Sequence, residues 1–198
     1  MKKITFTAKG VTPLLMHKFN IEQLTNQNKI KEGTTGNNPN EWKTSIYHEG
    51  RRFLIPASNL HATISNGGKY IKAGRGTLVK VIPSAIRIPI QKFFINRELP
   101  DDLENLNFDN MTKDSSQPCY IDVRAVNNPA TKGKNIRYRM ALSPGWEAKI
   151  ELEWNDTIVS RDQIEKTIIS AGELVGILEA RSLGYGRFNV EDFSVSDI

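Results

Sequence analysis

The stretch SRDQIEKTIISAGELVGIL (Ser160–Leu178) gives the clearest structural signal in the chain. Its apolar residues recur at steps of four, three, four and three: Ile164, Ile168, Ala171, Val175 and Leu178. That spacing places them on one face of an amphipathic helix that packs against a sheet. Ser160 and Gln163 form a capping box, which is typical of a helix start. We therefore predict a helix near 160–180 that covers a sheet.

Segments that alternate apolar and polar residues lie on both sides of this helix. WEAKIELEW (146–154) precedes it and RFNVEDFSV (187–195) follows it, and both patterns predict half-buried strands. Near the N-terminus, 4–11 alternates in the same way. The short strand RRFLIP (51–56) then leads into a segment with helical spacing near 57–71.

The segment Thr77–Ile90 also has a strand-like composition. Proline cannot donate to a strand ladder, so Pro83 and Pro89 restrict this strand to an edge or to two short pieces. Between about 98 and 139 the chain departs from the core pattern. There CYIDVRAV and NIRYRMAL alternate around a turn-rich connection, which predicts a projecting β-hairpin.

The order of elements is strand, loop, helix, strand, insertion, strand, helix, strand. This is the split βαβ pattern of a ferredoxin-like (RRM-like) α+β domain, with an antiparallel sheet and two helices on one face. The 198 residues fit one such domain. We predict a core over about 1–97 and 140–198, with loop insertions and the basic hairpin over about 98–139.

The composition limits the compartment and the class of protein. A single cysteine, Cys119, excludes an internal disulfide and a cysteine-based zinc site, and it suits a reducing compartment. No apolar run is long enough to span a membrane. The first residues read as a strand and not as a signal peptide. We therefore expect a cytoplasmic protein without a membrane partner.

The sequence offers little for catalysis. His17, His48 and His61 lack the spacing of a zinc site, so we predict no metal and no cofactor. There is no phosphate-binding loop and no nucleophile motif. One alternative stays open, because a metal-independent ribonuclease needs only a general base and a few cations. His17, just after the first strand, could be that base.

Charge is strongly segregated along the chain. The net charge is +5, and no acidic residue occurs between Glu49 and Glu98. That span contains Lys69, Lys72 and Arg75 among its cations. Such segregation favours a basic face for a polyanion. The alternative is a solvated surface on which this span meets the acidic segment that follows it.

The predicted hairpin is rich in cations: Arg124, Lys132, Lys134, Arg137 and Arg139. Two tyrosines are interleaved with them, and Asp122 is the only acid from Pro118 to Arg139. Cations neutralise phosphates and flat rings stack on unpaired bases, so the pattern predicts single-strand binding. We expect Arg137 and Arg139 to be exposed, whereas the alternative is an ordinary solvated hairpin.

The segment LEARSLGYGRFNV (178–190) joins the last helix to the last strand. Gly184 and Gly186 allow close backbone approach, and exposed N–H groups in such a turn can bind an anion. Arg181 and Arg187 would add charge and Tyr185 a stacking surface. The alternative is a plain turn with glycine as a helix C-cap.

These residues resemble a known family. SLGYGRFNVEDF after a long helix is similar to the C-terminal glycine-rich loop of the RAMP superfamily, the repeat-associated proteins of CRISPR complexes. GRRFLIPASNLHATISNG is similar to the segment of their backbone subunits that runs from a short strand into the first helix. The chain also resembles phage and prophage proteins without a firm function, in Thr12–His17, in Arg137–Arg139 with Trp146, and in Gly186–Val190.

The resemblance implies single-stranded RNA binding along a helical row of identical subunits, with a thumb-like hairpin that pins the strand. Some backbone subunits cut target RNA with an aspartate after the first strand, but no aspartate occurs here before Asp101. Processing ribonucleases of the superfamily often use histidine, which keeps His17 and His48 as candidates.

From these observations we expect a non-catalytic protein that binds single-stranded RNA or DNA, forms homo-oligomers along the strand, and associates with other CRISPR-type subunits. A metal-independent endoribonuclease is the second reading. A phage interaction protein that docks an acidic partner is the third. The sequence leaves open whether the role is antiviral defence, phage replication or counter-defence.

Overall fold

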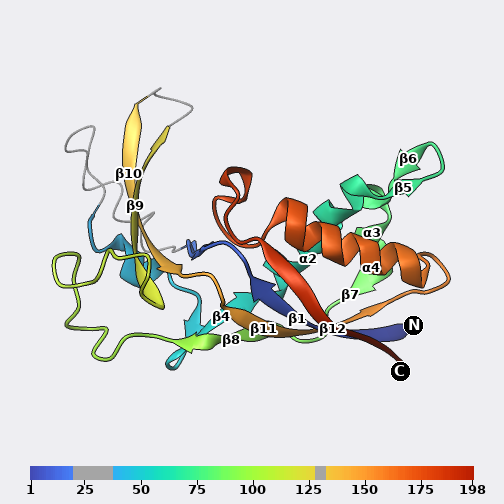
Figure 1. Ribbon diagram of the computed structural model, residues 1–198, viewed down its shortest axis with the longest axis horizontal. Coiled ribbons are helices and arrows are strands. Elements are labelled where there is room, and N and C mark those ends of the chain that lie inside the picture. The colour runs from blue at the N-terminus through green and yellow to red at the C-terminus, as the bar shows by residue number, and fades with distance from the viewer. Residues whose placement is uncertain (20–37, 128–132) are drawn as a thin grey trace.

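The computed structural model describes residues 1–19, 38–127 and 133–198 (Figure 1). Its main sheet has the strand order β12-β1-β11-β8-β4-β3, and β7 also pairs with β11. Every pairing in it is antiparallel. The strands are β1 (Lys2–Gly10), β3 (His48–Glu49), β4 (Arg52–Pro56), β7 (Ile86–Arg87), β8 (Lys92–Glu98), β11 (Glu147–Trp154) and β12 (Phe188–Asp197).

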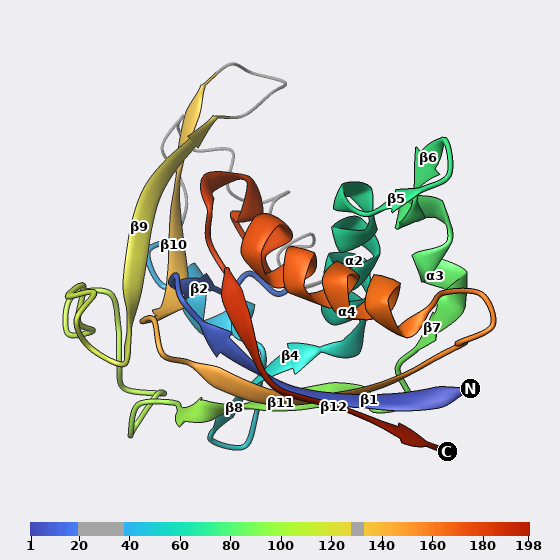
Figure 2. The same ribbon diagram turned by 45° about the vertical axis from the view of Figure 1, so that its right-hand side comes forward.

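Two helices, α2 (Ala57–Gly67) and α4 (Arg161–Ser170), lie side by side on one face of this sheet (Figure 2). The start of α4 is the predicted capping box. The Gln163 N–H donates to Ser160 Oγ at 3.3 Å, and the Ser160 N–H donates to Gln163 Oε1 at 3.1 Å. The α+β prediction of a ferredoxin-like antiparallel sheet with helices on one face is therefore confirmed.

The core lies between the helices and the sheet. Alternate residues of β1, among them Ile4 and Phe6, point into it, while their neighbours face the other side of the sheet. Ile164 and Ile168 of α4 are fully buried against these strands, as the helical spacing predicts. Each such side chain contributes about 1.5–3 kcal/mol to the free energy of unfolding.

The last helix is shorter than its periodicity suggests. After Ser170 the helix widens into a π turn, η4 (Ala171–Val175), and Gly176 ends it at φ +79°. Leu178 is buried but has φ +63°, so it lies in the loop and not on the helix. The prediction of a helix to about 180 was wrong at this end. At Gly176 the backbone packs against the carbonyl of Tyr185, which leaves no room for a side chain.

Within the segment Thr77–Ile90 only Thr77, at the end of β6 (Gly76–Thr77), and the two residues of β7 lie in strands, so the strand prediction was wrong for most of it. The 3-10 turn η3 (Leu78–Lys80) and the short helix α3 (Ile82–Ala85) precede β7. Pro83 is in the first turn of α3, where a proline nitrogen leaves no hydrogen bond unmade. Before them, the turn η2 (Gly68–Tyr70) leads into the small hairpin β5 (Lys72–Ala73) and β6 (Gly76–Thr77).

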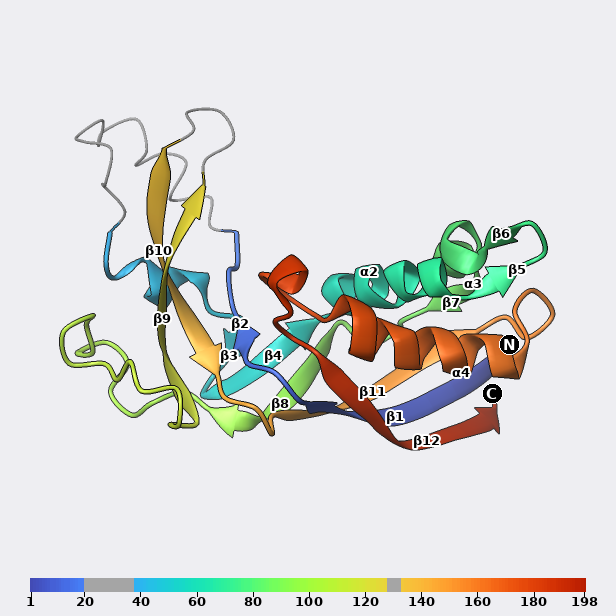
Figure 3. The same cartoon turned by 45° about the horizontal axis from the view of Figure 1, so that its top comes forward.

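The predicted basic hairpin is present as β9 (Cys119–Asn127) and β10 (Lys134–Leu142). With β2 (Leu14–Leu15) it forms a second, three-stranded sheet that projects from the main sheet (Figure 3). The turn η1 (Glu41–Ser45) packs on β10. Among the described helices, none has the length and apolar character needed to cross a membrane.

Candidate nucleic-acid interface

The return loop (176–187), which joins η4 to β12, is closed by two glycines. A Cβ atom on Gly186 would overlap the Ile177 carbonyl oxygen, and one on Gly176 would lie 2.5 Å from the Tyr185 carbonyl oxygen. Both glycines have positive φ, which other residues adopt only with strain. The Ile177 N–H donates to the Gly186 carbonyl at 2.9 Å and ties the ends of the loop together.

The backbone amides of the glycine turn, from Gly184 to Arg187, already have acceptors. The N–H of Gly184 donates to Arg181 O at 3.0 Å, and the N–H of Gly186 donates to Pro13 O at 2.9 Å. The N–H of Arg187 donates to Thr12 Oγ1 at 2.8 Å. The expectation that free N–H groups of this turn bind an anion was therefore wrong. Gly184 and Gly186 shape the loop, and its side chains are what can reach a ligand.

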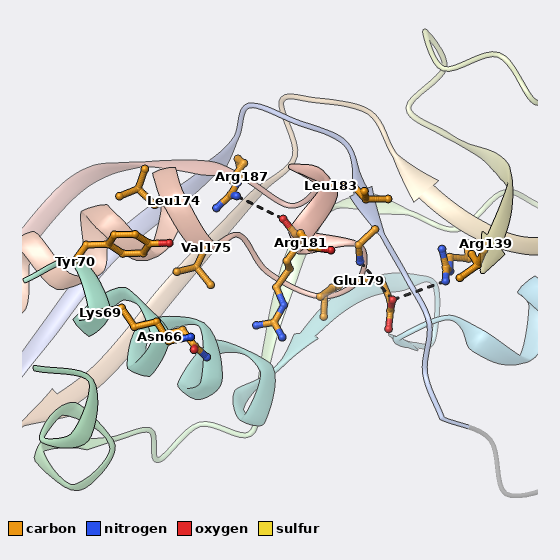
Figure 4. Close-up of a pocket in the computed structure, with 14 residues that line it drawn as sticks. Asn66, Lys69, Tyr70, Arg139, Leu174, Val175, Glu179, Arg181, Leu183 and Arg187 are labelled. Atoms are coloured by element: carbon orange, nitrogen blue, oxygen red, sulfur yellow. Dashed lines mark hydrogen bonds and ion pairs between the residues drawn. The ribbon is translucent and has the colours of Figure 1, made fainter. Parts of the chain in front are cut away.

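A cleft of about 780 Å³ opens between the return loop, the end of α2 and the hairpin (Figure 4). We call it the cleft. Four cationic side chains line it: Arg139 from β10, Lys69 from η2, and Arg181 and Arg187 from the return loop. Residues far apart in sequence therefore meet at one opening. The predicted hairpin, the predicted glycine turn and the acid-free span each supply one wall.

Two of these guanidinium groups have buried nitrogens without a partner. Arg139 Nε and Arg187 Nη1 are inaccessible to water and make no hydrogen bond within the described residues. Arg187 Nη2 donates only to the Arg181 carbonyl, at 3.4 Å. A buried donor without an acceptor costs about 1–3 kcal/mol, and more for a charged group. The charge of both groups therefore lies at the wall of the cleft, although water does not reach these two atoms.

The cleft also offers apolar and aromatic surface. Tyr70 at its rim is 52% exposed and Leu183 on the loop is 67% exposed. Leu174 and Val126 are exposed apolar residues on two other walls. Apolar surface bordered by cations is the combination that takes unpaired bases and their phosphates together.

The hairpin arginines are in a different state. Arg139 is only 8% exposed and its Nη2 lies 3.9 Å from Glu179 Oε2. Arg137 Nη1 lies 3.5 Å from the buried carboxylate of Glu41. The expectation that both arginines are exposed was therefore wrong for Arg139, which is buried, whereas Arg137 is partly exposed and paired. Alternation along a strand identifies which side chains share a face, but not whether another segment covers that face.

Arg124 is likewise engaged. Its Nε donates to both carboxylate oxygens of Asp122, at 2.7 and 2.9 Å, and its guanidinium lies 4.4 Å from the centre of the Tyr185 ring. Tyr185 also packs against Leu15 and Tyr120. The hairpin and the return loop, predicted as separate sites, are thus joined by a cation–π contact. One face of the Tyr185 ring is occupied by this contact.

The remaining predicted cations differ in position. Lys72 and Arg75 are exposed on the β5–β6 hairpin, next in sequence to Lys69, and Lys134 is exposed near the tip of the large hairpin. Within the described residues none of these three has a carboxylate partner. Lys132 lies outside the described residues.

The structure adds residues that sequence reasoning missed. Glu41 and Glu179 neutralise hairpin arginines from other segments, and Tyr70 supplies an exposed ring at the cleft. A lone glutamate in a loop gives no signal of its partner. Tyr70 could have been noticed, since it follows Lys69 in the acid-free span.

The two candidate histidines lie apart. His17 is half-buried, and burial is the main cause that lowers its pKa, with Arg139 and Arg137 lowering it further and Glu179 and Glu41 opposing them. Its Nδ1 has no partner within the described part of the chain. His48 is exposed on β3, where Nδ1 lies 3.0 Å from the Gly50 carbonyl oxygen. Over the same described part, no three His, Cys, Asp or Glu side chains group as metal ligands.

The face of the main sheet opposite the helices is charged but balanced. Lys3 pairs with Glu151 at 2.8 Å, and Arg87 pairs with Glu153 at 2.5 Å. Lys9 lies between two glutamates, at 3.5 and 3.8 Å. Carboxylates next to each of these cations repel phosphates, so this face is a poor surface for a nucleic acid.

No family model and no curated protein matches the chain. Among solved structures, one similar chain comes from the cryo-EM structure of the type III-B Cmr-beta bound to cognate target RNA. The two chains are 12% identical with a TM-score of 0.50, and the match covers 99% of this chain and 61% of that one. This chain thus spans about three fifths of the length of the chain it matches. At this identity the likeness establishes a common fold.

Proposed function

We propose that this chain binds single-stranded RNA in the cleft and does not cut it. The observation that carries the proposal is that four cations from separate segments, Lys69, Arg139, Arg181 and Arg187, line one cleft. A phosphate supplies a negative charge and several acceptor oxygens, so it suits cationic donors gathered in this way. Lys69 and Arg181 extend the positive charge along the same cleft.

The shape of the site favours a single strand over a duplex. Tyr70, Leu174 and Leu183 expose apolar surface beside the cations. In a duplex the faces of the bases are stacked on one another, whereas a single strand presents them to aromatic and apolar side chains. The exposed cations of β5 and of the loop after it, Lys72 and Arg75, would continue the path of the backbone beyond Lys69.

We further propose that several copies of the chain line up on one strand, as RAMP-type backbone subunits do. The fold shared with a chain of the type III-B Cmr-beta bound to target RNA supports this assignment. The projecting β9–β10 hairpin has the form expected of an element that reaches a neighbouring copy (Figure 3). Other subunits of a CRISPR-type complex are the partners that this architecture suggests.

The test is direct binding by fluorescence anisotropy. Labelled oligonucleotides of equal length are compared as single-stranded RNA, single-stranded DNA and duplex RNA, and the strand lengths are checked on gels after incubation. We expect the tightest binding for single-stranded RNA and intact strands after incubation. Equal affinity for the duplex would contradict the role of the apolar wall. Absence of binding at low salt would contradict the function itself.

A second function, RNA cleavage without a metal, is favoured by one observation. Burial, the largest cause, lowers the pKa of His17, which favours the neutral imidazole, and the charges of Glu179 and Arg139 also act on this pKa. A neutral imidazole with a free nitrogen can act as a general base. Cleavage in the presence of a chelator, lost in His17→Ala and kept in His48→Ala, would establish this second function in place of the first.

A further inference from the structure

Glu179 is held at the cleft by an unfavourable backbone. Its two neighbours, Leu178 and Ala180, have φ of +63° and +55°, a left-handed conformation that is strained for residues other than glycine. The Glu179 N–H donates to the Leu15 carbonyl at 3.3 Å. The Ala180 N–H donates to Glu179 Oε2 at 3.3 Å. The carboxylate of Glu179 is therefore held in place between two residues with strained backbone conformations.

That carboxylate faces the most buried cation of the cleft. Glu179 Oε2 lies 3.9 Å from Arg139 Nη2, across the gap between the return loop and β10 (Figure 4). Burial is the largest cause of the pKa shifts of His17 and Tyr47. Glu179 opposes the lowering of the His17 pKa and adds to the raising of the Tyr47 pKa. The ion pair is long and the carboxylate is partly exposed, so the pair contributes little stability. Stability alone does not account for the strained placement.

We propose that Glu179 is a built-in competitor for the phosphate site: its carboxylate occupies the position on Arg139 that a strand phosphate takes, and the phosphate must displace it. This inference rests on the proposed function, since it assigns a regulatory residue to the same site. Arg181 and Arg187 line the same cleft and lack a carboxylate partner within the described residues. They can therefore bind the phosphate when it displaces Glu179 from Arg139.

Because a ligand must displace Glu179, the site is selective for polyanions that contact several cations at once. An anion that can bind only Arg139 gains little, because it replaces one acidic group with another. A polyanion that also engages Lys69, Arg181 and Arg187 gains contacts that the carboxylate cannot provide. Displacement also changes the salt dependence, because the released carboxylate takes up a cation while the phosphate gives one up. The contact with Arg139 then adds little to the net release of counterions.

The test compares Glu179→Gln with Glu173→Gln. Glutamine keeps the shape and the acceptor for the Ala180 N–H but has no charge. Glu173 is exposed on η4, outside the cleft lining, and its replacement removes the same charge from the same region. Binding of a labelled single-stranded RNA is measured over a salt series.

We expect the log–log salt slope of Glu179→Gln to be steeper than that of the parent by about 0.7, the value for one added single-strand phosphate contact. If the two proteins converge at about 1 M salt, this slope makes Glu179→Gln about fivefold tighter at 0.1 M. Glu173→Gln should show the parent slope. If Glu179 is merely structural, Glu179→Gln binds more weakly and melts at a lower temperature, which overturns the proposal.

Two further measurements separate this inference from the proposed function. In an Arg139→Gln background the gain from Glu179→Gln should disappear, and a persistent gain would overturn the role of Arg139. Tripolyphosphate is the second probe, because a bound anion raises the melting temperature. A larger rise in Glu179→Gln with no RNA binding by any variant would keep the competitor and reject the RNA function. Equal rises in both proteins would reject the competitor.

Discussion

The molecule has two cation-rich regions, the inner face of the β9–β10 hairpin and the rim of the cleft, and they differ in what surrounds the charge. On the hairpin Arg124 pairs with Asp122, and Arg137 pairs with Glu41. At the cleft rim, Lys69 and Arg181 have no carboxylate partner within the described residues, and the rim is solvent-accessible. Arg139 belongs to both regions.

The difference shows that the number of cations in a segment does not identify a binding surface. A paired arginine has already replaced its water and its counterion with a carboxylate, so a phosphate gains less from it. An unpaired cation releases its counterions when a phosphate arrives, which is the main source of affinity. Arg124 and Arg137 therefore serve mainly to attach the hairpin to the core, and the cleft is the better candidate for contact with the strand.

The largest expected effect is on stability, at the hairpin. Arg139→Glu would place a second carboxylate opposite Glu179 at an almost fully buried position. A buried carboxylate without a cation, placed beside another carboxylate, is strongly destabilising, so we expect the free energy of unfolding to fall by about 3 kcal/mol or more. Urea denaturation measures it. Lys134→Glu on the exposed part of the same strand is the control, with a change within about 0.5 kcal/mol. Equal effects would contradict the burial of Arg139.

Tyr70 and Tyr185 have different surroundings, so their replacement should have different effects. Tyr70 is exposed at the cleft, so Tyr70→Ala should weaken single-strand binding by about 1–3 kcal/mol through lost stacking, with the salt slope unchanged. Tyr185 is packed between Arg124 and Leu15, so Tyr185→Ala should mainly lower the melting temperature. Anisotropy and thermal unfolding of both variants test this. The reverse assignment of the two effects would move the stacking site to the return loop.

Charge at the cleft rim has a smaller and salt-dependent effect. Lys69→Ala with Arg181→Ala should lower the log–log salt slope by about 1.4, since each lost single-strand contact contributes about 0.7. Stability should change by less than about 0.5 kcal/mol per exposed substitution. The matched control is Lys149→Ala with Arg161→Ala, which removes two exposed cations outside the cleft lining. A slope change of the same size in this control would indicate a general charge effect.

The smallest expected effect concerns pH. The folded protein holds the pKa of His17 below its usual range, mainly by burial, so the unfolded chain binds a proton more readily. The stability that this provides is present above the unfolded pKa and is lost as the pH falls below it. His17→Gln should therefore show a weaker loss of stability than the parent between neutral and mildly acidic pH. Identical pH profiles in urea denaturation would contradict the burial of this imidazole.

Much of the core could be predicted from local patterns. The capping box at Ser160, the alternation of 4–11 and the order of elements depend on neighbouring residues only, so they can be read from the sequence. The end of the last helix could not be predicted, because Gly176 leaves the helix to fit against the carbonyl of Tyr185, nine residues further along the chain. The helical turn at Ile82–Ala85 was not predicted, because the segment around it is rich in β-branched residues, which are typical of strands.

The cations of the candidate site could be predicted from the sequence, but their pairing with carboxylates could not. Arg181, Arg187 and Lys69 were identified because their charge can be read from the sequence. Other cations of the acid-free span are paired in the structure: Arg51 with Glu98 and Asp101, Lys92 with Glu49, and Arg87 with Glu153. The role of Arg139 was misjudged, since its partner Glu179 is forty residues away in sequence and comes from a loop with no pattern. Pairing across the fold is a property of the tertiary structure, so it enters only when the elements are assembled.

The hydrogen bond between Ile177 and Gly186 has a consequence for protein engineering. It makes the segment between them a closed Ω-loop whose ends are fixed independently of its tip, where Ser182 and Leu183 are exposed. Extra residues inserted between those two would lengthen a loop that is already closed, and the entropic cost of closure grows only with the logarithm of length. The tip can therefore carry a short peptide tag or a fluorophore site beside the cleft, without a change in the strands that the loop connects.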